Sequence, residues 1–279
     1  MAKFPKAVVF LFTLAAMIAA DVAAGRAEGE LEKIKRADKI RIGVSSDKPP
    51  FSYIDEEGLN QGYDVFFARR IARDLLGDES KVEFVLVENN NRMAILQSGE
   101  VDMVLANFTV TSERSKQVDF AKPYMKVALG VASPKNAPVT SVAQLGGKKL
   151  IVGKGTTADI YFTRRHPEVR LVRYDQNAEA FEALRNGLGA ALAHDNILIF
   201  AWINNNPDFI AGVDSLGDPG YIAPAVKKGN TDLLQWLNSE IAALSQENFF
   251  HSNFETTLRP VFGNKVRPEM VVVESELLR

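Results

Sequence analysis

The sequence predicts an α/β fold in which two lobes, each built around its own sheet, lie in close contact. Strand and helix patterns alternate along the chain, as they do in proteins built on largely parallel sheets. The alternation starts again near residue 127, and no flexible or low-complexity linker separates the two halves. Each half has about a hundred residues, which is enough for a lobe with its own core.

The first half begins with a charged helix and then alternates buried strands with amphipathic helices. In the helix patterns, apolar residues recur at spacings of three and four, and the longer helix ends at a glycine. In chain order we expect a helix at 29–39, a strand at 39–45, a helix at 63–77, a strand at 81–87, a helix at 90–100 and a strand at 101–107.

The second half repeats this order and adds a long helix near its end. The segment 149–165 predicts a strand, a glycine turn and a helix, and 190–202 predicts a strand that runs directly into a helix. The tail from His251 onward has no pattern that predicts an element. The other expected elements are strands at 127–133, 169–174 and 222–229, and helices at 139–147, 177–189 and 231–246.

The first 27 residues predict a secretory signal rather than part of the fold. A short basic start precedes an apolar run of 14 residues from Ala7 to Ala20. Such a run is too short to span a bilayer but suits the apolar region of a signal peptide. Small residues follow, so cleavage after Ala24 or Ala27 is expected. We therefore expect an exported, soluble protein.

Composition excludes several classes of function. A formal net charge of −2 argues against a nucleic-acid partner. The chain has no cysteine, which excludes disulfides, a lipid anchor on a cysteine and a thiolate metal site. Zinc is not expected either, because the three histidines are scattered through the chain. No cofactor is expected; the histidines are His166, His194 and His251.

Three short polar stretches follow predicted strands, where the binding sites of α/β proteins lie. In the first, Asn107 and Thr109 are two residues apart, so they face the same way on an extended chain, and Arg114 follows soon after. Thr111 is placed to cap a short helix beginning at Ser112. The alternative for this stretch is a capped helix with an exposed arginine.

The second stretch holds Gly153 and Gly155, followed by Thr156 and Thr157 at the start of a helix. The free N–H groups and the dipole of a helix N-terminus suit an anion. The spacing is not that of a phosphate-binding loop. A threonine that only caps the helix is the alternative interpretation.

In the third stretch, Asp195 lies between an apolar strand and an apolar helix, where it could cap the helix or face a cleft. His194 precedes it, but adjacent residues on a strand point to opposite faces, which disfavours a catalytic pair. Together the three stretches offer an arginine and N–H donors for a carboxylate, and acceptors for an ammonium group. A free α-amino acid needs this set of groups.

The chain resembles periplasmic binding proteins for polar amino acids, the receptors of ABC importers known as solute-binding protein family 3. The resemblance covers essentially the whole chain after the signal segment. It rests on IGVSSDKPPFSYID, GYDVFFARRIARDL, NNRMAILQSGEVDMVLANFTVTSERSKQVDFAKPY, VGKGTTADIYF and ALAHDN. Within the family, the chain is most similar to receptors for cysteine, on YDQNAEAFEAL, HDNILIFAW, APAVKKG and NFFHSNFETTL.

The resemblance implies a periplasmic binding protein-like type II fold, with two α/β lobes joined by two crossing hinge segments. These segments are expected near 124–127 and 221–224. Residues 28–126 and 223–279 would then form lobe 1, and residues 127–222 would form lobe 2.

The resemblance also implies roles for the residues of the three stretches. Arg114 would bind the ligand carboxylate with its planar fork, which lysine lacks. Thr157 would donate to the same carboxylate, at the helix N-terminus that Thr156 begins. Thr109 and the backbone of Asn107 would accept from the ammonium group, and Asp195 would pair with it.

The side-chain pocket departs from the family pattern. Lys48 stands where relatives that bind large basic ligands often carry an aromatic residue, and Phe51 remains as a wall. Arg92 matches a position that meets the side-chain carboxylate in receptors for acidic ligands, and its alternative is an exposed helix arginine. Two cations disfavour a basic ligand. The pocket would be completed by Tyr124.

L-Cysteine is the expected ligand, with glutamate, aspartate or another small polar amino acid as alternatives. The expected partners are an ABC permease and its ATPase, and the protein is expected to be a periplasmic monomer that is not an enzyme. One alternative is a cyclohexadienyl dehydratase acting on prephenate or arogenate, for which only Glu88 and His194 could be the general acid. Another is a sensing or adhesive protein of the same fold.

Overall fold

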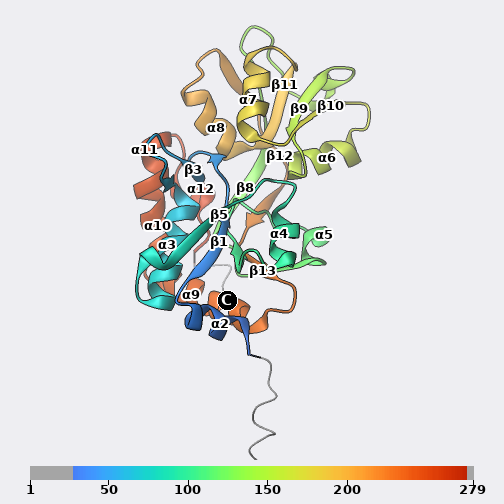
Figure 1. Cartoon of the computed structure of the whole chain (residues 1–279). Coiled ribbons are helices and arrows are strands. Elements are labelled where there is room, and N and C mark those ends of the chain that lie inside the picture. The colour runs from blue at the N-terminus through green and yellow to red at the C-terminus, as the bar shows by residue number, and fades with distance from the viewer. Residues whose placement is uncertain (1–27, 275–279) are drawn as a thin grey trace, which may run out of the picture.

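The computed structural model describes residues 28–274, which form two lobes, one above the other in Figure 1. The expected signal segment, residues 1–27, lies outside the described residues, as do residues 275–279. The alternation of strand and helix patterns predicted two α/β lobes, as the family resemblance also implied, and the prediction is confirmed.

Lobe 1 is built on a mixed five-stranded sheet in the order β5-β1-β6-β13-β7. Strands β5, β1 and β6 are parallel to one another, whereas β13 is antiparallel to both of its neighbours. A small antiparallel sheet, β2-β3-β4, adjoins it. The strands are β1 (Ile40–Val44), β2 (Asp47–Lys48), β3 (Ser52–Ile54), β4 (Asn60–Gln61), β5 (Val82–Leu86), β6 (Met103–Val104), β7 (Val118–Phe120) and β13 (Ala225–Lys227).

Lobe 2 has its own five-stranded sheet in the order β10-β9-β11-β8-β12. Here β10, β9 and β11 are parallel, and β8 and β12 are antiparallel to their neighbours. The strands are β8 (Met125–Pro134), β9 (Lys149–Gly153), β10 (Arg170–Tyr174), β11 (Ala191–Asp195) and β12 (Phe209–Ile222).

Helices cover both sheets. Those of lobe 1 are α2 (Glu30–Ala37), α3 (Tyr63–Leu76), η1 (Glu79–Lys81), α4 (Arg92–Ser98), α5 (Ser112–Ser115), α9 (Thr231–Gln246), α10 (Phe249–Asn253), the π-helix η3 (Phe254–Leu258), α11 (Arg259–Phe262) and α12 (Pro268–Val271). Those of lobe 2 are η2 (Val142–Leu145), α6 (Thr157–Arg165), α7 (Asn177–Arg185) and α8 (Asn196–Asn204).

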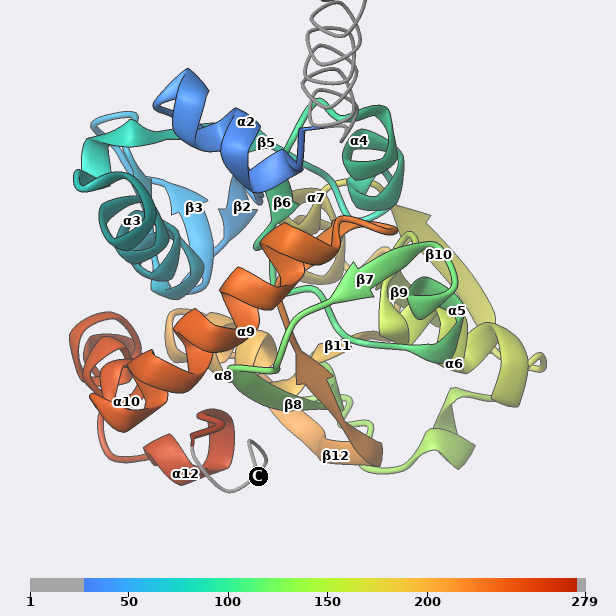
Figure 2. The same ribbon diagram turned by 90° about the horizontal axis from the view of Figure 1, so that it is seen from below.

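The long helix α9 shows how periodicity places an element. Its buried residues Leu233, Leu237, Ile241 and Leu244 recur at spacings of three and four, so one face packs into the core of lobe 1. Seen from below, α9 runs across this lobe, with α3 on its left and β7 on its right (Figure 2). Its observed bounds are those that the sequence predicts.

Most predicted elements are confirmed within one or two residues at their ends, but several differ. The strand predicted at 101–107 is assigned only over Met103–Val104, and the helix at 139–147 is a 3₁₀ turn, Val142–Leu145. The sequence patterns missed β12 entirely. They also missed the helices after residue 249, although Phe250, Phe254, Leu258 and Phe262 recur every four residues and are buried.

Strand β8 begins beside the junction between the lobes, and strand β12 ends there. The two strands pair with each other. Met125 lies opposite Ile222, at the segments where the chain was expected to cross. Ile222 also forms a bridge to Thr109 of lobe 1. The pairing brings the two segments where the chain was expected to cross close together.

In residues 28–274, no helix has the length and apolar character that spanning a membrane requires.

Candidate functional site

The predicted polar stretches meet between the lobes. Asn107 follows β6 in lobe 1, Thr156 and Thr157 follow β9 in lobe 2, and Asp195 ends β11. Parallel strands bring their carboxyl ends to the same edge of a sheet, and the two edges face each other here. All of the predicted site residues except Thr157 are buried; they are Lys48, Phe51, Arg92, Asn107, Thr109, Arg114, Tyr124, Thr156 and Asp195.

Arg114 connects the lobes through backbone carbonyls. Its Nη1 donates to Thr109 O at 2.7 Å in lobe 1, and its Nη2 donates to Gly155 O at 3.0 Å in lobe 2. Gly155 has a positive φ of 73°, which a side chain would disfavour in this turn. Burial lowers the pKa of Arg114 to about 10, so the guanidinium stays charged at neutral pH. Its unused N–H donors remain for an anion.

Asn107 is held in an unusual conformation by Asp64. Its φ is +47°, a left-handed value that asparagine tolerates better than most residues. Asp64 Oδ2 accepts from the Asn107 N–H at 2.7 Å, while Asp64 Oδ1 accepts from the Tyr124 hydroxyl at 2.7 Å. Burial raises the pKa of Asp64. The carboxylate therefore fixes the backbone from which the site is built.

Asp195 faces Asn107 across the cleft. Asn107 Nδ2 donates to Asp195 Oδ2 at 2.8 Å, and Thr157 Oγ1 lies 3.4 Å from Asp195 Oδ1. Asp195 occupies the N-cap position of α8 but makes no side-chain capping bond, so the capping interpretation is wrong. Asn107 Oδ1 is buried and has no hydrogen-bond partner among the described residues. A carboxylate and an unsatisfied amide oxygen thus lie together.

Arg92 and Arg114 share one aromatic ring. The guanidinium carbons lie 4.4 Å and 4.8 Å from the centroid of Phe108, within the range of a cation–π contact. Arg92 Nη1 also donates to Ala106 O at 2.9 Å. Burial and then the charge of Arg114 lower the pKa of Arg92 to about 9. Arg92 is buried, so the alternative of an exposed helix arginine is wrong; its side chain supports the segment that carries Asn107.

Lys48 is a buried amine without a hydrogen bond. The residue is 2% exposed, and no described residue accepts a hydrogen bond from Nζ. Burial and then the charge of Arg92 lower its pKa from 10.5 to about 7, against the opposing pull of Asp195. An amine held in this way is available to a polar group that enters the cleft.

This lowered pKa predicts that Lys48 destabilises the ligand-free protein, most strongly at neutral pH and below. Between about pH 7 and 10.5 the unfolded chain binds a proton that the folded chain does not, so the free energy of unfolding should rise with pH through this Lys48 effect. Lys48→Met should be more stable than wild type at pH 7, with the difference shrinking toward pH 10. Denaturant unfolding at several pH values measures it, and a difference that stays constant would contradict it.

Three predicted residues have their polar groups committed elsewhere. The Thr156 hydroxyl caps α6 by accepting from Asp159 N at 3.2 Å, as the alternative for that stretch foresaw, and it donates to Gly153 O at 2.7 Å. Tyr124 bonds Asp64 and packs among aromatic rings in lobe 1. The Phe51 carbonyl accepts from Asp64 N at the start of α3, where Gly62 lets the chain pass close by.

His194 and Glu88, the two candidate acids of a dehydratase, are not arranged for catalysis. His194 Nδ1 accepts from the Asp195 backbone N–H at 2.7 Å, and Nε2 bonds Asn177 Oδ1 at 3.0 Å. Burial lowers the pKa of His194 to about 4, so the ring is neutral. Glu88 accepts from Gln176 of the other lobe. No three imidazole or carboxylate groups in residues 28–274 lie together as a metal site would require.

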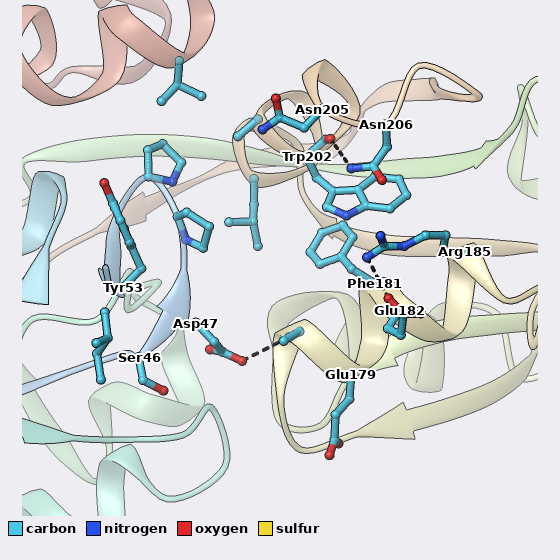
Figure 3. A pocket seen from close by; sticks show the side chains of 17 residues that line it. Ser46, Asp47, Tyr53, Glu179, Phe181, Glu182, Arg185, Trp202, Asn205 and Asn206 are labelled. Atoms are coloured by element: carbon cyan, nitrogen blue, oxygen red, sulfur yellow. Dashed lines mark hydrogen bonds and ion pairs between the residues drawn. The ribbon is translucent and has the colours of Figure 1, made fainter. Parts of the chain in front are cut away.

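Two cavities lie between the lobes. One of about 290 Å³ is lined by Thr109, Thr157 and Asp195, and it marks the predicted site. The larger, of about 870 Å³, contains none of the predicted site residues and is shown in Figure 3. Its walls include the prolines of lobe 1 and the stacked rings of Phe181 and Trp202 of lobe 2. Among the buried charged residues, Asp195 lines the smaller cavity and none lines the larger one, so the smaller cavity is the candidate binding site.

Sequence reasoning missed two residues of the site, Asp64 and Phe108. It also missed the hydrogen bonds by which side chains of one lobe contact the other lobe. A signal existed for Asp64, because Phe67, Ala68 and Ile71 follow it at spacings of three, four and seven on the buried face of α3. A charge in line with a buried stripe indicates a paired, functional carboxylate. No pattern marks Phe108, because an aromatic residue between two polar ones is common.

The chain matches the model of the bacterial extracellular solute-binding proteins, family 3, over residues 40–255. It is similar to the solute receptor for L-cysteine of Neisseria gonorrhoeae, with 55% identity and a TM-score of 0.87, covering 88% of this chain and 99% of that one. The cysteine-binding protein of Campylobacter jejuni is 52% identical, with a TM-score of 0.88, and covers 89% of this chain and 100% of its own.

Receptors for other amino acids are similar at lower identity. The ABC transporter glutamine-binding protein GlnH of Bacillus subtilis is 32% identical over 232 residues, which are 82% of this chain and 84% of that protein. The matching family and these relatives are binding proteins, not enzymes.

Proposed function

Because the chain belongs to the bacterial extracellular solute-binding proteins of family 3, we propose that it captures L-cysteine between its lobes for an ABC importer. The family and its relatives make the chain an amino-acid-binding receptor of ABC transport rather than an enzyme. The choice of L-cysteine among amino acids is the proposal. Two structurally similar receptors that bind cysteine, at 55% and 52% identity, favour it.

The observation that carries the proposal is the pair of opposite charges placed for a zwitterion. Arg114 offers charged N–H donors, while Asp195 and the unsatisfied Asn107 Oδ1 offer acceptors. Buried ionic groups must be paired, and a free amino acid supplies the missing partner to each side. Arg114 would then bind the α-carboxylate, and Asp195 would bind the α-ammonium.

The charges near the site oppose a basic side chain. Lys48, Arg92 and Arg114 are buried cations, whereas Asp64 and Asp195 are the buried anions that act on them. A lysine or arginine ligand would add a further cation to this excess. A small side chain that accepts a hydrogen bond suits the unpaired Lys48 amine, and a thiol or thiolate is such a group. Glutamate and aspartate are the second choice.

Delivery follows from closure of the lobes on the ligand. We place the hinge at the paired segments 124–127 and 221–224, with residues 28–126 and 223–279 in one lobe and 127–222 in the other. The closed monomer would dock on a permease that works with an ATPase. Membership in an extracellular family supports export to the periplasm, and we propose that the signal segment is cleaved after Ala24 or Ala27.

A ligand screen by thermal unfolding tests the proposal. Ligand-stripped protein is heated with each of the twenty amino acids, with cysteine kept reduced. A ligand at a hundred times its dissociation constant adds about 2.7 kcal/mol, or roughly 5–10 °C in Tm for a chain of this size. L-Cysteine should give the largest shift. If glutamate or aspartate gave the largest shift instead, that amino acid would be assigned as the ligand in place of cysteine. If none of the twenty amino acids gave a shift, the proposal would be overturned.

A further inference from the structure

Helix α7 of lobe 2 begins without a side-chain cap from its own lobe. The residue at its N-cap, Gln176, makes no capping bond, because its side chain donates to Glu88 of lobe 1. The first N–H groups of a helix have no partner within the helix and need an acceptor from elsewhere. The start of α7 faces lobe 1, so an acceptor can come from that lobe.

Asp47 of lobe 1 supplies that acceptor. Its Oδ2 accepts from Asn177 N at 2.6 Å and from Ala178 N at 3.1 Å, and its Oδ1 accepts from Asn177 Nδ2 at 2.8 Å. Figure 3 shows the Asp47 carboxylate pointing toward the helix that carries Glu179. A carboxylate at this position also has a favourable interaction with the positive end of the helix dipole.

Asn177 links this contact to the binding site. Its Oδ1 accepts from Asn89 Nδ2 of lobe 1 at 3.1 Å and bonds His194 Nε2 at 3.0 Å. His194 Nδ1 in turn accepts from the backbone N–H of Asp195. A continuous series of hydrogen bonds therefore runs from Asp47 to the residue proposed to bind the ammonium group.

Asp47 also precedes Lys48 in the two-residue strand β2. Successive residues of a strand point to opposite faces. Asp47 faces α7, and Lys48 faces the buried charges of the site. Fixing Asp47 to lobe 2 consequently fixes the backbone that holds the Lys48 amine in place.

We propose that Asp47 is a positioning residue for ligand capture, which holds the lobes together by capping α7 from the opposite lobe. This inference rests on the proposed function, because the cap forms only when the lobes are in contact. Opening removes all three hydrogen bonds of Asp47 at once. The cap therefore stabilises the closed, liganded form and slows release of the ligand.

The test compares Asp47→Asn with Glu179→Gln. Asp47→Asn has nearly the same shape but loses the charge and a matched acceptor, whereas Glu179→Gln removes a carboxylate from the first turn of the same helix without a contact to lobe 1. Stopped-flow fluorescence with L-cysteine gives the two rate constants. Dissociation should be roughly tenfold faster in Asp47→Asn, about the effect of losing a helix cap, with association nearly unchanged. Glu179→Gln should match wild type.

Hydrogen exchange provides a second measurement, made on the closed protein with the amino acid that binds in the thermal screen. The amides of Asn177 and Ala178 should lose protection in Asp47→Asn while the later amides of α7 keep theirs. Uniform loss throughout the protein would indicate general destabilisation and overturn the proposal. So would unchanged exchange, or equal dissociation rates in Asp47→Asn and wild type. If wild type binds another amino acid rather than L-cysteine, the ligand assignment fails, and exchange measured with that amino acid still decides the role of Asp47.

Discussion

Arg114→Ala is expected to reduce the affinity for L-cysteine at least about a hundredfold while the protein remains folded. Truncating one partner of a buried, hydrogen-bonded charge pair costs roughly 2–5 kcal/mol of binding free energy. Here the guanidinium also ties the turn at Gly155 to lobe 1, so both the ligand contact and closure would weaken. Isothermal titration calorimetry measures the affinity, and circular dichroism checks the fold.

Two further variants define what Arg114 contributes. Arg114→Lys keeps the charge but lacks a planar fork, so it should bind nearly as weakly as the alanine variant. Arg73→Ala removes an exposed arginine of the same lobe and should bind as wild type does. Affinity near that of wild type in Arg114→Ala would remove Arg114 from the site.

Asp195→Asn should reduce the affinity for L-cysteine by a similar factor, because Asp195 is proposed to bind the ammonium end of the ligand. The substitution keeps the shape of the side chain, but it removes the negative charge and replaces one carboxylate oxygen with an NH2 group that can only donate. The ammonium group would then face a donor and would lose its counter-charge. We expect a loss of at least about a hundredfold in affinity, consistent with an unpaired buried charge.

Asp195→Asn should also reveal the charge balance of the site. The carboxylate stabilises the charged forms of Lys48, Arg92 and Arg114. Without it, the ligand-free protein should unfold at lower denaturant concentration. Asp218→Asn, on the exposed rim of the same cavity, is the matched control and should change neither property. Equal binding by Asp195→Asn and Asp218→Asn would contradict the assignment of the ammonium site.

Local sequence patterns predicted the secondary structure correctly where the conformation of an element depends mainly on its own residues. The apolar stripe of α9 and the alternation of strand and helix need only the near neighbours in the chain, so their bounds could be predicted. Strand β12 failed because FIAGVDSLGDPGYI has no alternation. It is extended because it pairs with β8, through several register shifts, and that partner lies far away in sequence.

The sequence by itself determined two α/β lobes, polar stretches at the ends of their strands, and the residue types that an amino acid requires. Only the tertiary structure decided which side chains face one another across the cleft. It placed Asn107 against Asp195, buried the Lys48 amine without a hydrogen bond to any described residue, and turned Asp47 toward α7. The physical reason is that periodicity reports the faces within one element, whereas contacts between lobes depend on how two separately folded cores meet.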